Sequence, residues 1–66
     1  MLSKREEILI RWLKAIGMSE DNTMGVILAL DTPEKQDTLA RFMTGNKDAT
    51  DQDVLRETVR ILKATT

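Results

Sequence analysis

Signals that start and stop helices recur so closely along this chain that no regular element can be long. Hydroxyl residues suited to cap helix N-termini occur at Ser3, Ser19, Thr32 and Thr50, and glycines suited to follow helix ends occur at Gly17 and Gly45. The segments between them, at about 4–16, 20–30, 33–44 and 51–64, carry apolar residues at helical spacing. The 66-residue sequence therefore predicts a single all-α domain, residues 1–66, built as a compact bundle of four short helices. The short connections leave open whether these helices cross orthogonally or run up and down.

Two of the expected helix starts carry a second, more specific signal. Ser3 is followed three residues later by Glu6, and Thr50 by Asp53, which is the spacing of a capping box. In this motif each side chain satisfies a backbone N–H group that the helix itself leaves without a partner. At the end of the first helix, Gly17 is expected to adopt a left-handed conformation, because it has no Cβ atom.

The stretch MGVILAL, residues 24–30, is uncharged in a chain of which 32% of the residues are charged. It is much shorter than the ~20 residues that a membrane-spanning helix needs. Its large apolar residues cover more than half of the helix circumference: Met24, Val26, Ile27, Leu28 and Leu30. The pattern predicts that 20–30 is the central helix of the bundle, with Leu28 in the core. Gly25 and Ala29 are small, and we expect them to let a neighbouring helix approach closely.

Each of the other three helices shows an apolar stripe that is expected to face the core. The stripes comprise Ile8, Leu9, Trp12, Leu13 and Ile16 in the first helix, Leu39, Phe42 and Met43 in the third, and Val54, Leu55, Val59 and Leu62 in the fourth. With only two aromatic residues in the chain, the core must consist mainly of aliphatic side chains.

The composition argues against catalysis. The chain has no histidine, cysteine or tyrosine, so the usual general bases and nucleophiles are absent. We therefore expect a protein that is not an enzyme and that uses no cofactor. The lack of cysteine also fits a reducing compartment, and the prediction is a cytoplasmic protein without membrane association.

One segment has a partial resemblance in spacing to a calcium-binding loop. Residues 46–57 place oxygen-bearing side chains at loop positions one, three and five and a glutamate at position twelve. The glycine that such a loop needs at position six is replaced by Asp51, and position nine is Val54. The segment is better explained as a connection closed by the capping box of Thr50 and Asp53, and no metal site is predicted.

The fourth helix offers a nucleic-acid-binding alternative. Arg56, Arg60 and Lys63 form a basic stripe on its outer side, with Lys47 in the preceding connection. Small helical domains often bind DNA through a helix-turn-helix, and the last two helices could form such a unit. The net charge of −1 argues against this function, because dedicated nucleic-acid-binding domains usually carry an excess of basic residues.

Three apolar residues lie outside or at the margin of the inward stripes and could form a protein interface. They are Ile10 in the first helix, Val26 in the second and Ile61 in the fourth. A chain this short gains stability when it buries additional apolar surface in an oligomer. The sequence therefore predicts a small non-catalytic module for protein interaction or self-association, whose partner is another protein or a second copy of the chain in a homo-oligomer.

Overall fold

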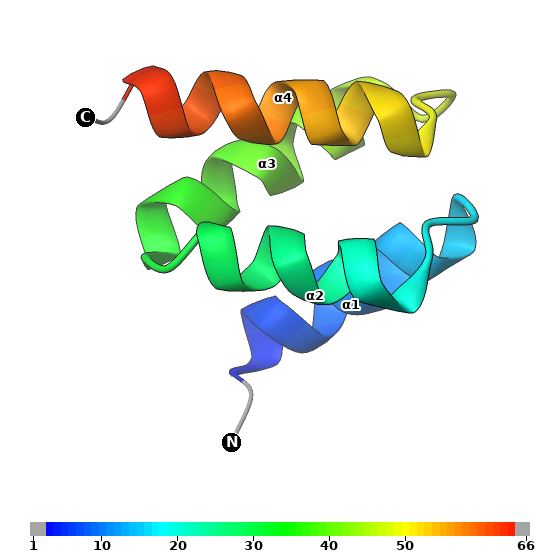
Figure 1. The fold of residues 1–66 in the computed structure, drawn as a ribbon, viewed down its shortest axis with the longest axis horizontal. Coiled ribbons are helices and arrows are strands. Elements are labelled where there is room, and N and C mark those ends of the chain that lie inside the picture. The colour runs from blue at the N-terminus through cyan, green and yellow to red at the C-terminus, as the bar shows by residue number, and fades with distance from the viewer. Residues whose placement is uncertain (1–2, 65–66) are drawn as a thin grey trace.

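A computed structural model describes residues 3–64 and contains four α-helices (Figure 1). Their bounds are Lys4–Ala15 for α1, Glu20–Ala29 for α2, Pro33–Gly45 for α3 and Asp51–Ala64 for α4. No strand occurs within the described residues. The all-α class and the four-helix bundle are thus confirmed, and each helix end lies within one residue of its expected position.

Local hydrogen bonds explain where the helices start. The Ser3 hydroxyl accepts a hydrogen bond from the Glu6 N–H at 3.2 Å, and the Ser3 N–H donates to Glu6 Oε1 at 2.9 Å. Thr50 and Asp53 make the same reciprocal pair at 3.2 and 3.1 Å. Both predicted capping boxes are confirmed, so the connection before α4 is closed by its own side chains.

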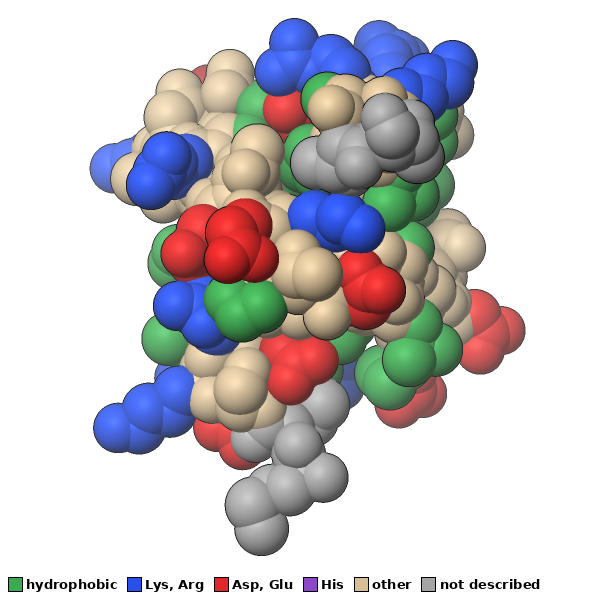
Figure 2. Space-filling view, turned by 90° about the vertical axis from the view of Figure 1, so that its left-hand side faces the viewer, with side chains coloured by type: hydrophobic (Ala, Val, Ile, Leu, Met, Phe, Trp, Pro, Cys, Tyr) green, Lys and Arg blue, Asp and Glu red, His purple; other side chains and the backbone are tan. Residues whose placement is uncertain are grey.

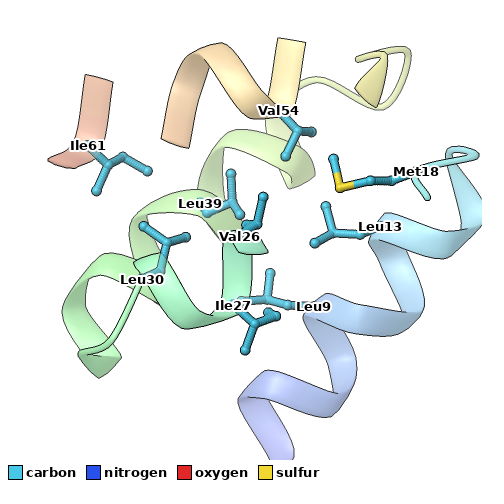
Figure 3. Close-up of a cluster of buried hydrophobic side chains, with 9 residues drawn as sticks. All are labelled: Leu9, Leu13, Met18, Val26, Ile27, Leu30, Leu39, Val54 and Ile61. Carbon is cyan, nitrogen blue, oxygen red and sulfur yellow. The ribbon is translucent and has the colours of Figure 1, made fainter. Parts of the chain in front are cut away.

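The turn after α1 directs the chain back towards the core. Gly17 has a φ of +89°, which confirms the predicted left-handed conformation. Its N–H donates to the Lys14 carbonyl at 3.0 Å, and the Met18 N–H donates to the Leu13 carbonyl at 3.1 Å. These two bonds form a Schellman motif, in which the residue after the glycine contacts the last helical turn. Figure 3 shows the Met18 and Leu13 side chains lying next to each other and both pointing into the core.

The helices pack as two pairs that are joined through cross-contacts. α1 packs against α2 and α3, and α4 packs against α3 and α2. In Figure 1, α4 lies along the top, and α2 crosses the lower part of the molecule in front of α1. One core lies between them, and its buried apolar residues are Leu9, Leu13, Met18, Val26, Ile27, Leu30, Leu39, Val54 and Ile61 (Figure 3).

α2 differs from the expected central helix. Leu28 is 73% exposed, and a Cβ atom placed on Gly25 would meet no heavy atom within 4 Å. The predictions of a buried Leu28 and of a close helix contact at Gly25 and Ala29 are therefore wrong. Only one side of α2 faces the core, because α1 and α4 leave its opposite side uncovered. Thr23 lies on the buried side, where its hydroxyl donates to the Ser19 carbonyl at 2.8 Å.

Candidate protein-interaction surfaces

The three residues predicted as an interface do not form an exposed surface. Val26 and Ile61 belong to the core, with exposed fractions of 2% and 4%. Ile10 is half-buried and packs against the same core. The expectation that these side chains are left outside the core is wrong, because the buried face of each helix is centred differently from the predicted stripe. In α4, for example, the buried face includes Thr58 and Ile61, whereas Val59 points outward.

Large apolar side chains are instead exposed at positions that were expected to face inward. Ile8 and Trp12 of α1 lie one turn apart and are 45% and 38% exposed. Met24 and Leu28 of α2 are also exposed and one turn apart, and Val59 is exposed on α4. Single exposed apolar residues are common on protein surfaces, but pairs at helical spacing form continuous apolar strips.

The exposed pair of α1 lies in a groove between α1 and α3. The groove consists of two adjoining hollows of about 450 and 300 Å³, and Trp12 lines both of them. Ile8 and Ala40 line the larger hollow, whereas Ile16 and Met43 line the smaller one. We call this feature the α1–α3 groove and define it by these five residues.

The charges around the α1–α3 groove are mainly basic. Arg5 Nε donates to Asp37 Oδ1 at 2.6 Å, and this ion pair joins α1 to α3 beside the larger hollow. Lys4 lines the larger hollow and Lys47 lines the smaller one. Among residues 3–64, neither lysine takes part in a salt bridge. The groove is therefore lined mainly by apolar side chains, with the Arg5–Asp37 ion pair at its larger hollow and one lysine on each hollow.

The sequence contains a signal that could have pointed to this groove. The apolar stripe of the first helix contains two adjacent pairs, Ile8 with Leu9 and Trp12 with Leu13. Adjacent residues in a helix point about 100° apart, so both members of a pair cannot point into the centre of one core. The structure buries Leu9 and Leu13 completely and leaves Ile8 and Trp12 at the surface.

The four residues predicted for nucleic-acid contact line one concave surface. Lys47, Arg56, Arg60 and Lys63 surround a hollow between the end of α3 and α4. Figure 2 shows basic side chains gathered at the top of the molecule, over α4. The structure thus brings the predicted residues together, and nucleic-acid binding by them stays a prediction.

Acidic side chains are interleaved with these basic residues. The carboxylate of Asp53 lies 4.0 Å from Arg56, and that of the buried Glu57 lies 2.9 Å from Arg60. Asp48 lines the same hollow, so four basic residues face three acidic ones and the local net charge is only +1. A phosphate backbone would meet carboxylates as well as cations here, which weakens electrostatic attraction.

Neither a metal site nor a membrane-spanning helix is found in the part of the chain that the structure describes. No group of three histidine, cysteine, aspartate or glutamate side chains within residues 3–64 is placed to hold a metal ion. The longest described helix, α4, has 14 residues, and no described helix is long and apolar enough to cross a bilayer.

Comparison of the chain with protein-family models, with curated proteins and with solved structures finds no match. The candidate function therefore depends on the geometry and chemistry of the surfaces described above.

Proposed function

We propose that this chain is a non-catalytic protein-interaction module that binds its partner through the α1–α3 groove. The observation that carries the proposal is the exposure of Ile8 and Trp12, one turn apart, along a groove lined by apolar side chains. Tryptophan is enriched among residues that dominate binding energy, because it buries a large area and loses little conformational entropy.

The shape of the groove suits a helical or extended apolar segment. A groove between two helices can accept side chains that project from one face of a partner helix. The lysines at its ends, Lys4 and Lys47, favour a partner that carries acidic groups beside its apolar residues. A second copy of the chain and an unrelated protein both remain within this proposed function.

The nucleic-acid alternative is supported by one observation, namely that Lys47, Arg56, Arg60 and Lys63 share a hollow. We prefer protein interaction because the three interleaved carboxylates oppose phosphate binding, whereas apolar side chains make up most of the exposed lining of the groove. Titration with duplex DNA and RNA at low salt separates the two functions. Binding that weakens steeply with salt and is lost in the double variant Arg56→Ala, Arg60→Ala would favour the alternative.

Site-specific photocrosslinking tests the proposed function. A photoreactive amino acid is placed at Ile8 in the α1–α3 groove, and a matched variant carries it at Lys14, which is exposed on the same helix but does not line the groove. After irradiation in a lysate of the source cells, we expect a discrete protein adduct at position 8 that is absent at position 14.

A second substitution makes this result specific to the groove. Met43→Glu places a charge on the opposite wall of the smaller hollow and is expected to remove the adduct formed at position 8. Adducts that form equally at positions 8 and 14, or that persist in the Met43→Glu variant, would show that the groove does not bind a partner.

A further inference from the structure

We infer that the occupant of the α1–α3 groove is a second copy of this chain, which inserts the exposed strip of α2. This strip is defined by Asp21, Met24, Gly25 and Leu28, all of which are exposed. The inference rests on the proposed function of the groove and adds the identity of the partner. Three properties of the two surfaces support it: their shape, their charge and their position on the molecule.

The apolar features of the two surfaces match in number. Met24 and Leu28 are four residues apart, so their Cα atoms are separated by about 6 Å along the helix axis. The groove offers two adjoining hollows on either side of Trp12. The strip therefore offers one large apolar side chain for each hollow. Gly25 lies between them without a side chain, which lets the α2 backbone approach the indole ring.

The charges of the two surfaces are complementary. α2 contains no basic residue, and its first turn carries Glu20 and Asp21. Among residues 3–64, neither carboxylate takes part in a salt bridge. A lysine stands at each end of the groove, Lys4 at one and Lys47 at the other. The acidic end of α2 thus meets a positive charge in either direction of docking.

The positions of the two surfaces make the contact head-to-tail. α2 packs on one side of α1, and the groove lies on the side of α1 that faces α3. Because the strip points away from the core, a copy cannot fill its own groove. Two different surfaces therefore meet in each contact, and such a contact produces a ring, an open chain or a two-fold dimer in which the contact occurs twice.

Two single variants each remove one half of this contact. Ile8→Glu introduces a charge into the groove and leaves the strip intact, whereas Leu28→Glu introduces a charge into the strip and leaves the groove intact. In sedimentation equilibrium at tens of micromolar, we expect the wild-type chain to be larger than a monomer. Each variant alone should be a monomer, with association weakened on the order of tenfold or more. Val59→Glu is the matched control, because Val59 is about as exposed as Ile8 but lies on neither surface, and it should associate like the wild type.

Mixing the two variants distinguishes a contact of the strip with the groove from a contact between two identical surfaces. The Ile8→Glu chain still presents an intact strip, and the Leu28→Glu chain still presents an intact groove. We expect an equimolar mixture to form a 1:1 dimer that does not grow further. Circular dichroism establishes that each variant is folded, and Trp12→Gln with Met24→Gln provides a second pair of variants if a glutamate prevents folding.

Three outcomes would overturn the inference. They are a monomeric wild-type chain, two monomeric variants that do not associate on mixing, and a control variant that disrupts association as strongly as Ile8→Glu. A monomeric chain that still forms a specific adduct with a different protein at position 8 would leave the proposed function intact and refute only the second copy as its partner.

Discussion

The side-chain amide of Gln36 donates a 2.7 Å hydrogen bond to the backbone carbonyl of Leu30, and both residues are buried. This bond spans the turn between α2 and α3 and satisfies a carbonyl at the end of α2 that has no partner within the helix. The same amide group lies 3.5 Å from Glu6 Oε2 of α1. Gln36 therefore joins three helices at one corner of the core, where a purely apolar side chain would leave a carbonyl without a donor.

Replacing Gln36 with methionine tests this role. The methionine side chain has a similar length but cannot donate to the Leu30 carbonyl, so the free energy of unfolding should fall by about 1–3 kcal/mol. Urea denaturation followed by circular dichroism measures the change. Gln52→Met is the control, because Gln52 is exposed on α4 and its replacement should change stability by less than about 0.5 kcal/mol. Equal effects of the two substitutions would show that the hydrogen bond contributes nothing.

Two leucines near the end of α2 should respond very differently to truncation. Leu30 is fully buried, so Leu30→Ala should cost about 2–5 kcal/mol, a large part of the stability of so small a domain. Leu28 is mostly exposed, and Leu28→Ala should change stability by less than about 0.5 kcal/mol. Thermal unfolding measures the stability of both variants. It is carried out at protein concentrations low enough to exclude association. A large loss for Leu28→Ala in the monomer would contradict the structure.

Two glycines are predicted to respond to alanine with opposite signs. Gly25 lies inside α2 with open space around it, so Gly25→Ala should stabilise the monomer by about 0.5–1 kcal/mol through better helix propensity. Gly17 has a positive φ, so Gly17→Ala should destabilise by about 1–2 kcal/mol although the site is not crowded. Denaturation midpoints of both variants measure the difference. The same sign for both would contradict the assigned backbone conformations.

Stability should depend on the protonation of Glu6. The pKa of Glu6 lies below its ordinary value of 4.5, because its carboxylate accepts hydrogen bonds from the Ser3 backbone N–H and the Ser3 hydroxyl. A group with a lowered pKa in the folded state contributes stability that is complete above the unfolded value and is lost as the pH falls through the folded value. The melting temperature of the wild-type chain should therefore fall as the pH drops below about 4.5.

The variant Glu6→Gln isolates this contribution. Glutamine can still accept the hydrogen bond from the Ser3 N–H, but it does not titrate, so the melting temperature should depend less on pH in the acid range. Part of the dependence should remain, because the pKa of Asp31 is also lowered, by its hydrogen bond with Lys35 and by the charge of that residue. If the melting temperatures of the wild type and the variant fall equally as the pH is lowered, Glu6 has no role in this dependence.

The helix boundaries could be predicted from the sequence because local chemistry determines them. The capping boxes at Ser3 and Thr50 and the left-handed Gly17 each depend on residues within three or four positions, and all three are confirmed. The number and type of the helices followed from the same local signals. No knowledge of tertiary packing was needed for these features.

Which side of each helix is buried could not be predicted in the same way. Leu28 and Val26 belong to one apolar run, and only the positions of α1 and α4 decide that Val26 is covered and Leu28 is not. Ile8 and Ile61 were misplaced for the same reason. The α1–α3 groove could be predicted only in part: the adjacent apolar pairs of α1 indicate one exposed wall, whereas the juxtaposition of α1 with α3 is not encoded in the periodicity of either helix.

The packing of the helices in pairs has a consequence for how the chain folds. α1 with α2 and α3 with α4 are neighbours in sequence, whereas the contacts of α1 with α3 and of α2 with α4 join the two halves. Each half can form its own helical hairpin rapidly, because the loop to be closed is short. Neither hairpin alone encloses the core, since Leu9, Leu13 and Ile27 lie in one half and Leu39, Val54 and Ile61 in the other. We therefore expect docking of two weakly stable hairpins to be the rate-limiting step of folding, on the microsecond-to-millisecond scale of small helical proteins.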